Sequence, residues 1–134
     1  MQTLDQRRAA DSLKKVRRIQ ERLPEDKADS YADYTIRLPA SILINGLGQA
    51  VAQLQAAAGT DKEDPHLLLY HDLSHWLCRD EVEAPYRGEK DLLEGIVSKD
   101  RGHYLRAQAE AMAWLEWHKK LVTAYLKKME RESS

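Results

Sequence analysis

The chain has 134 residues, of which 32% are charged and 43% are hydrophobic, and its formal net charge is −1. That length suits one domain with its own hydrophobic core, and that composition excludes an intrinsically disordered chain. No apolar stretch approaches the roughly 20 residues that cross a membrane, and residues 1–12 lack the apolar centre of a signal peptide. Because Cys78 is the single cysteine, no internal disulfide can form. We therefore expect a cytoplasmic protein with one domain over residues 1–134.

The charge is divided unevenly along the chain. Residues 1–24 carry seven Lys/Arg against three Asp/Glu, residues 25–99 carry seven against fourteen, and residues 100–134 carry seven against five. Both ends are therefore basic and the middle is acidic. Such a division indicates one surface that faces a polyanion and a second, acidic surface that contacts other proteins.

The first part of the chain predicts two helices separated by a polar segment. Residues 3–22 place apolar side chains at helical spacing, and Pro24 closes this first helix. Residues 25–30, which read EDKADS, are predicted to be a linker. A second apolar face begins at Tyr31, and Pro39 is expected to kink or restart the helix there.

Local start and stop signals place the remaining elements. Gly59 suits the residue that follows a helix, while Asp64 and Pro65 together form a start signal. Asp100 can cap the last helix. The later predicted helices cover residues 43–58, 65 to about 79, 90–97, and 101 to about 130. No alternating β pattern is present, so the sequence predicts an all-α fold, a compact single-domain bundle of five to six helices.

Basic side chains follow helical spacing in the first and last predicted helices. At about 100° per residue, those of the first helix form two neighbouring stripes opposite Leu13 and Val16. In the last helix they lie opposite an apolar face, with Trp117 beside them; this Trp either packs against another helix, lies at a protein interface or stacks on a base. Each basic face is either a solvated surface or one that binds the phosphates of a nucleic acid. The candidate RNA-binding residues are Arg7, Arg8, Lys14, Lys15, Arg18, Arg22, Arg106, Lys119, Lys120 and Lys127.

Three residues in the predicted helix that starts at Pro65 imitate a metal site. His71, His75 and Cys78 recur at i, i+4 and i+7, a spacing that lets three side chains point at one zinc ion. The same positions also suit one face of a helix in mostly apolar surroundings. The pair His71-Asp72 is similar to the metal-binding pair of HD phosphohydrolases. We predict no metal, no cofactor and no catalytic residue, and we keep two alternatives: a small metal-dependent phosphohydrolase using His71, Asp72 and His75, and a helical regulator that binds duplex DNA.

Two stretches of the sequence carry a family pattern. Residues 38–54 read LPASILINGLGQAVAQL, and residues 104–121 read YLRAQAEAMAWLEWHKKL. In this order, and in a chain of this size, they resemble the small helical subunit of the type III-B CRISPR effector, the Cmr RNA-guided complex. The chain departs from that pattern at Gln108, at Leu121 and at His118, which is predicted to be a packed histidine. The motif residues, for which we predict a structural role, are Pro39, Asn45, Gly46, Gly48, Gln49, Tyr104, Glu110, Trp114 and Trp117.

The resemblance implies a non-catalytic subunit in antiviral defence. Members of this family stack into a short filament beside the backbone subunits and line the channel in which guide RNA pairs with target RNA. The implied partners are therefore the backbone and other subunits of the Cmr complex, guide RNA, target RNA and further copies of the chain, with no membrane. Basic helix faces match this role, because binding to an RNA backbone needs positive charge and shape rather than base-reading side chains. Gly46 and Gly48 would then end one helix and let the next pack closely.

Overall fold

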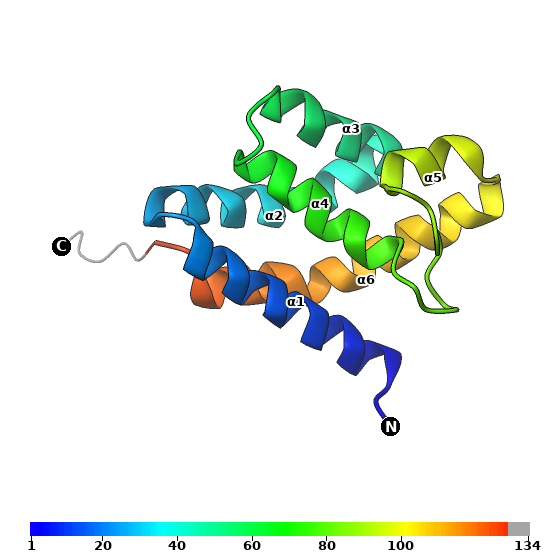
Figure 1. Cartoon of the computed structure of the whole chain (residues 1–134), viewed down its shortest axis with the longest axis horizontal. Helices are drawn as coiled ribbons and strands as arrows, with labels where there is room; N and C mark the ends of the chain where they lie inside the picture. The colour runs from blue at the N-terminus through cyan, green and yellow to red at the C-terminus, as the bar shows by residue number, and fades with distance from the viewer. Residues whose placement is uncertain (129–134) are drawn as a thin grey trace.

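Six α-helices make up the computed structural model, which describes residues 1–128 (Figure 1). No strand occurs within these residues. The predicted all-α fold class and the predicted number of helices are therefore confirmed. No helix in this part of the chain is both long enough and apolar enough to cross a membrane. The helices are α1 (Leu4–Arg22), α2 (Glu25–Asn45), α3 (Leu47–Ala58), α4 (Pro65–Leu77), α5 (Leu92–Ser98) and α6 (Arg101–Tyr125).

Three helix ends lie where the local signals placed them. The side chain of Asp64 accepts a hydrogen bond from the backbone N–H of His66 at 2.8 Å, and Pro65 is the first residue of α4. Asp100 caps α6 by accepting from the backbone N–H of His103 at 3.1 Å. Gly59 follows α3 with a φ of +61°, in the left-handed region that favours glycine.

The predicted linker at residues 25–30 is wrong, because this segment forms the first turns of α2. Ala28 is buried there, and it continues the same apolar stripe as Tyr31 and Ala32. Glu25 and Asp26 lie in the first turn, where negative charge favours a helix N-terminus. The polar composition of the segment therefore hid a helix that is amphipathic from its start.

Pro39 neither ends nor restarts a helix, since α2 continues past it to Asn45. A proline inside a helix costs about 3 kcal/mol. Leu38 and Ile42, on either side of this proline, are both buried in the core, and their packing offsets that cost. The last helix also differs from its prediction: α6 ends at Tyr125, and the predicted extension to residue 130 runs beyond residue 128, outside the described residues.

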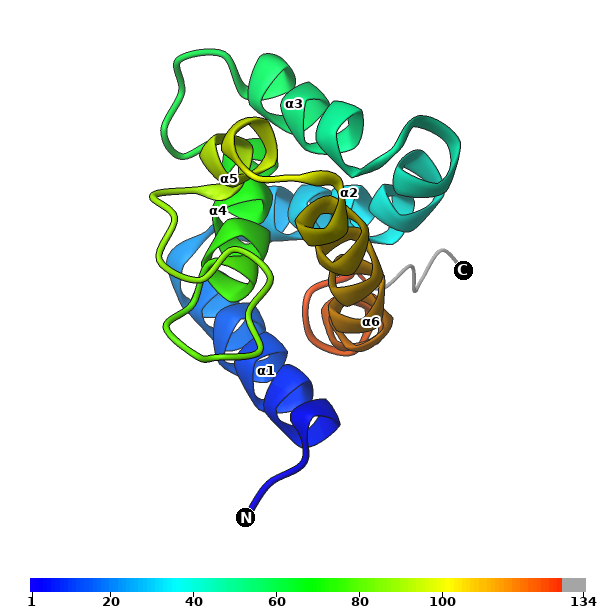
Figure 2. The ribbon, with the colours of Figure 1, turned by 90° about the vertical axis from the view of Figure 1, so that its right-hand side faces the viewer.

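The helices from the two ends of the chain, α1 and α6, lie side by side and run in the same direction (Figure 1). Ser12 of α1 contacts His118 of α6, and further along both helices Gln20 donates to the carbonyl of Tyr125. Between the termini, α2 packs on α3, α4 and α6. Figure 2 shows α3 and α5 at the top of the molecule and α1 at the bottom. The outward side of α1 is therefore left free of other helices.

Tyr and Trp supply the aromatic side chains of the core, because the chain contains no Phe. The polar atoms of these side chains need partners inside the protein. Tyr31 donates to Asp72 Oδ2 at 2.5 Å, and Trp114 Nε1 donates to Asp11 Oδ2 at 2.9 Å. Carboxylates of α1 and α4 thus take part in holding the core together.

His118 is fully buried, where α6 meets α1 and α2. Its Nδ1 accepts from the hydroxyl of Ser12 at 2.7 Å, and its Nε2 donates to the hydroxyl oxygen of Tyr31 at 2.8 Å. Tyr31 passes its own hydrogen to Asp72. Burial lowers the pKa of His118 well below its ordinary value, so the ring is neutral and both of its nitrogens are satisfied. The prediction of a packed histidine at this position is confirmed.

The junction between α2 and α3 shows what the glycines of the first motif do. Gly46 has a φ of +86°, and a Cβ added to it would lie 3.1 Å from the hydroxyl of Tyr104. Without a side chain, this residue cannot cap α3 itself. Instead, α6 supplies the caps: the backbone N–H of Leu47 donates to Gln108 Oε1 at 2.9 Å, and that of Gly48 donates to the hydroxyl of Tyr104 at 3.0 Å. The glycines therefore bring the start of α3 against α6.

Candidate nucleic-acid interface

The buried side of α1 includes Val16, as the spacing of its cations predicted, but it does not centre on Leu13. Its buried residues are Ser12, Lys15, Val16 and Ile19, whereas Leu13 is only partly buried. The six predicted cations of α1 therefore do not form a single exposed face. They divide into side chains that reach solvent and side chains held by a carboxylate, either of α1 itself or of another segment.

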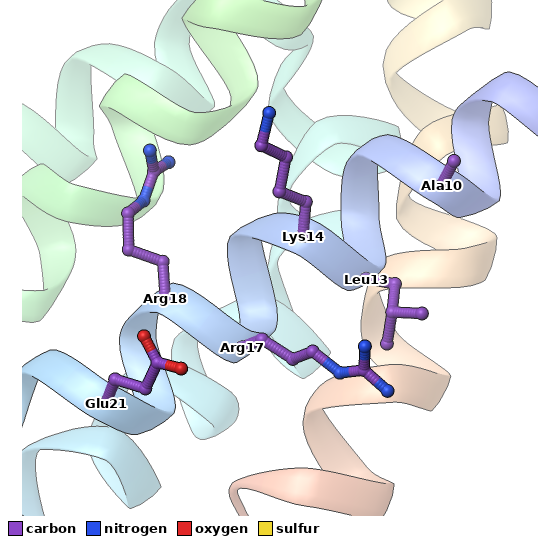
Figure 3. Close-up of a pocket in the computed structure, with 6 residues that line it drawn as sticks. All are labelled: Ala10, Leu13, Lys14, Arg17, Arg18 and Glu21. Carbon is purple, nitrogen blue, oxygen red and sulfur yellow. The ribbon is translucent and has the colours of Figure 1, made fainter.

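Three exposed cations lie on the outward side of α1, and we call Lys14, Arg17 and Arg18 the outer face of α1. Together with Ala10, Leu13 and Glu21 they line a shallow hollow (Figure 3). In this view Lys14 and Arg18 extend to one side of the helix, and Arg17 extends with Leu13 to the other. Lys14 and Arg17 have no ion pair with a carboxylate within residues 1–128. The outer face is thus free to meet an anion.

Lys15 cannot belong to a phosphate-binding face, because only 3% of it is exposed. Its Nζ lies 2.7 Å from Asp11 Oδ2 and 5.6 Å from the ring centroid of Trp114. Burial lowers the pKa of this ammonium group, and the nearby Asp11 carboxylate opposes that shift. The prediction of an exposed Lys15 is wrong, because the packing of Trp114 against α1 encloses its side chain.

Arg8 is also committed to the interior of the fold. Its Nε and Nη2 donate to the two oxygens of Glu110, at 2.7 and 2.8 Å, and Trp76 Nε1 donates to the same carboxylate at 2.9 Å. Burial by itself raises the pKa of Glu110, but the hydrogen bonds from Arg8 and Trp76 outweigh it, so the pKa is lowered. Glu110, a residue of the second family motif, thus joins α1, α4 and α6.

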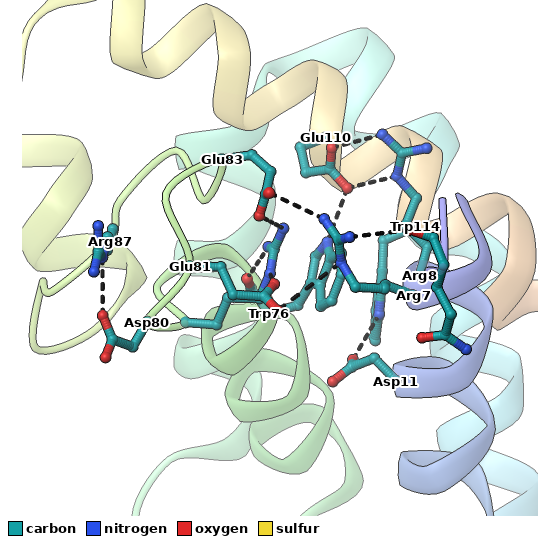
Figure 4. Close-up of polar contacts among 12 residues, drawn as sticks. Arg7, Arg8, Asp11, Trp76, Asp80, Glu81, Glu83, Arg87, Glu110 and Trp114 are labelled. Carbon is teal, nitrogen blue, oxygen red and sulfur yellow. Dashed lines mark hydrogen bonds and ion pairs between the residues drawn. The ribbon is translucent and has the colours of Figure 1, made fainter. Parts of the chain in front are cut away.

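The last two predicted cations of α1 pair with carboxylates nearer the surface. Arg7 Nη2 lies 3.0 Å from Glu83 Oε2, in the segment that follows α4 (Figure 4). Arg22 Nη2 lies 2.6 Å from Glu63 Oε2, and both of these side chains remain about half exposed. Neither arginine belongs to the outer face of α1.

The predicted cations of the last helix have different surroundings. Arg106 is exposed and has no carboxylate partner within residues 1–128. Both Lys119 and Lys120 pair with Glu116: the Nζ of Lys119 lies 3.1 Å from Oε2, and the Nζ of Lys120 lies 3.5 Å from Oε1. Lys127 follows the end of α6 and lies 2.6 Å from Asp33 of α2. These cations therefore do not form a single free basic stripe.

Trp117 packs against another helix of the same chain, which was one of the three alternatives for this residue. Its Nε1 donates to Asp5 Oδ1 at 3.1 Å, near the start of α1. Trp114 of the same motif is fully buried and stacks on His118 with ring centroids 4.0 Å apart. Both tryptophans thus contribute to the contact between α6 and α1.

The residues of the phosphohydrolase alternative do not come together. His71 and His75 are exposed, while Asp72 is buried and accepts hydrogen bonds from Tyr31 and Arg18. Within residues 1–128, no three His, Cys, Asp or Glu side chains are grouped so that they could hold a metal ion. Burial also raises the pKa of Cys78 to about 11, so its thiol is not an activated nucleophile.

Arg17 is the residue of the outer face that sequence reasoning missed. It lies four positions after Leu13, and the prediction that Leu13 faces the core therefore placed Arg17 on the wrong side of the helix. A repeat of Ser12, Val16 and Ile19 as the buried stripe would have placed Arg17 with Lys14. That signal is weak, because a serine rarely marks a core position.

Comparison with known proteins matches the part of the chain that holds all six helices to one protein family. A family model described as CRISPR-associated protein (Cas_Cmr5) matches residues 4–125, from the first residue of α1 to the last residue of α6. The chain is also similar to the X-ray crystal structure of a CRISPR-associated Cmr5 family protein from Thermus thermophilus. The two are 28% identical, the match covers 95% of this chain and 100% of that chain, and the TM-score is 0.70.

Proposed function

From the premise that the chain belongs to the CRISPR-associated Cas_Cmr5 family and is a subunit of the type III-B Cmr complex, we propose that it is a non-catalytic, RNA-contacting subunit. In this proposal, copies of the chain stack into a short filament beside the backbone subunits. The filament lines the channel in which guide RNA pairs with target RNA. The complex then acts on foreign RNA in antiviral defence.

The observation that carries the proposal is the outer face of α1. It presents three cations to solvent, and Glu21 lines the same hollow. Among residues 1–128 their one ion pair joins Arg18 to Asp72 at 3.4 Å, and the side chain of Arg18 is still 54% exposed. Lys and Arg on an exposed helix neutralise backbone phosphates without reading base edges. A subunit whose RNA partner changes with every guide needs contacts of this kind.

The stacking of copies makes a small patch sufficient. Three cations per copy give only weak binding, but each further copy in a filament adds its contacts at high effective concentration. The acidic middle of the chain remains available for protein subunits: residues 25–99 carry fourteen Asp/Glu against seven Lys/Arg. The two parts of the proposal, RNA contact and stacking, therefore support each other.

The test is to replace the outer face of α1 and measure how RNA binding depends on salt. Each lost phosphate contact should lower the slope of log affinity against log salt by about 0.7 to 0.9. We expect the variant Lys14→Ala, Arg17→Ala, Arg18→Ala to bind RNA more weakly, with a flatter slope and by the same factor for two RNAs of different sequence. The measurement belongs on the assembled complex as well as on the free chain.

A matched variant controls for the loss of charge alone. Lys27, Lys62 and Lys90 are exposed and belong to segments other than α1, so their replacement by Ala removes the same charge from other parts of the chain. This control should keep the wild-type slope. Equal slopes for both triple variants would contradict the proposal, and tighter binding of duplex DNA than of RNA would favour the DNA-binding regulator instead.

A further inference from the structure

A cluster of two arginines and two glutamates joins α1 to the segment that follows α4 (Figure 4). Arg7 Nη2 lies 3.0 Å from Glu83 Oε2, and Arg79 Nε donates to Glu81. Arg79 also stacks on Trp76, with its guanidinium carbon 3.5 Å from the ring centroid. The side chain of Arg79 is 9% exposed and that of Arg7 is 28% exposed. Each guanidinium group therefore lies within 4.0 Å of both glutamates.

The glutamates leave part of each guanidinium group unsatisfied. Arg7 Nε and Arg79 Nη2 are buried, and neither has a hydrogen-bond partner. The nearest carboxylate oxygens, on Glu81 and Glu83, lie 3.9 Å from these nitrogens, beyond hydrogen-bond distance. Buried donors without partners cost free energy, and the penalty is largest for charged groups. The cluster thus holds two donors that a better acceptor could satisfy.

A phosphodiester group of RNA has the chemistry that this pair of arginines lacks. It carries one negative charge, and each of its two non-bridging oxygens can accept hydrogen bonds from a guanidinium group. Arginine recognises phosphate through paired N–H donors, in hydrogen bonds that are stronger than neutral ones.

Apart from these contacts with the arginines, residues 81–83 take part in two backbone hydrogen bonds, from Glu81 N–H to the carbonyl of Arg79 and from Ala84 N–H to the carbonyl of Glu81, both at 2.9 Å and both within the segment. Val82, between Glu81 and Glu83, is 81% exposed, and both glutamate side chains are 40% exposed. The next buried residue is Ala84. Moving residues 81–83 away would therefore return two charged groups to water without removing an apolar side chain from the core.

We propose that Arg7 and Arg79 form a second RNA-phosphate site, which Glu81 and Glu83 mask in the free chain by occupying the place of the phosphate. RNA that is already bound to the outer face of α1 displaces the two carboxylates and takes their place on the arginines. The masked site rests on the proposed function, because it adds a contact to the same RNA. It predicts that neutralising the two glutamates strengthens RNA binding.

The experiment compares the wild type with Glu81→Gln, Glu83→Gln, using a fluorescently labelled oligouridylate as the probe, on the free chain and on the assembled complex. Glutamine keeps the shape of the side chain and removes its charge. We expect about three- to tenfold tighter binding and a salt slope that is steeper by about 0.7, as for one additional phosphate contact. Should the double variant fail to fold, as judged by its melting curve, Glu83→Gln alone tests the contact with Arg7.

Two triple variants of equal net charge separate a specific site from a general change in charge. Arg87 pairs with Asp80 at 2.8 Å on the same segment, and both side chains are at least half exposed. In the Glu81→Gln, Glu83→Gln background, Arg7→Gln should cancel the gain in affinity and Arg87→Gln should keep it. Equal binding of the two triple variants, or no gain in the double variant, would overturn the masked site.

The two proposals fail in different ways. If the outer-face variant of α1 loses RNA binding while Glu81→Gln, Glu83→Gln binds as the wild type does, only the masked site is overturned. If the outer-face variant binds RNA with an unchanged affinity and salt slope, the proposed function itself is contradicted.

Discussion

The two sides of α1 carry the same kinds of cation in different surroundings. Lys14 and Lys15 are neighbours in the sequence, yet Lys14 is exposed and only 3% of Lys15 is exposed. On the inner side, Lys15 and Arg8 each bind a carboxylate within the fold, whereas Arg17 on the outer face reaches solvent. A charge pattern therefore locates the cations of a helix, but the carboxylates and aromatic rings around each cation decide which of them remain for a ligand.

The largest expected effect comes from removing a cation of the inner side. Lys15→Ala leaves the carboxylate of Asp11 without its cation in a mostly buried site, and breaking such a pair costs about 3 to 4 kcal/mol. Lys14→Ala, one position away, should change the free energy of unfolding by no more than about 0.5 kcal/mol. Denaturant unfolding of both variants measures the difference. Similar losses in the two variants would remove the distinction between the two sides of α1.

The second prediction concerns the junction between α2 and α3, which contacts Tyr104 of α6. The inner side of α1 packs against the same helix, α6. Gly46→Val introduces a Cβ at a φ of +86° and 3.1 Å from the hydroxyl of Tyr104, so it should destabilise the fold by about 2 to 3 kcal/mol. Gly59→Val is the matched control. Its φ is +61° but nothing lies within 4 Å of the added Cβ, so Gly59→Val carries backbone strain alone and should cost less than Gly46→Val. Equal melting temperatures for the two variants would show that the contact with Tyr104 does not matter.

The smallest expected effect is a dependence of the free energy of unfolding on pH. It arises from His118 of α6, which contacts Ser12 on the inner side of α1. Burial lowers the pKa of His118 well below the value of about 6.5 that it has in the unfolded chain. The unfolded chain therefore takes up this proton first as the pH falls. The stability contributed by His118 is complete above about pH 6.5 and decreases below it, by about 1.4 kcal/mol per pH unit.

Two other titrating groups, Asp72 and His75, also affect the stability as the pH falls. Burial raises the pKa of Asp72, which opposes the trend at lower pH, while the charge of Lys15 and burial lower the pKa of His75, which reinforces it. The test is therefore a difference between proteins. His118→Gln should show a flatter decrease in the free energy of unfolding between pH 7 and 5 than the wild type. Identical pH profiles would mean that the buried ring does not titrate as its surroundings require.

Sequence reasoning found the parts of the fold that rest on local chemistry. Asp64 with Pro65, Asp100 and Gly59 set helix ends through atoms a few residues away, and the structure shows each of them. The same reasoning missed the start of α2. Ala28, Tyr31 and Ala32 already repeat at helical spacing in the sequence, but the polar residues around Ala28 suggested a linker.

The candidate site was harder to predict, because contacts between distant residues define it. Lys15 is enclosed only when Trp114, 99 positions later, packs against α1, and Arg8 finds Glu110 through the same contact. Gln108, which departs from the family pattern, caps α3 through a hydrogen bond to Leu47, a residue 61 positions earlier in the sequence. Exposure of a cation is thus a property of the tertiary structure, and the sequence alone left Lys14 and Lys15 equivalent.

Chemical reactivity of the lysines tests the central claim, that the outer face of α1 contacts RNA, most directly. An amine-reactive reagent, with modified sites identified by mass spectrometry, is applied to the free chain, to the RNA-loaded complex and to that complex after ribonuclease digestion. We predict that Lys14 reacts in the free chain, is protected in the loaded complex and reacts again after digestion, while Lys15 stays unreactive throughout. Lys14 that remains as reactive in the RNA-loaded complex as in the free chain would contradict the claim.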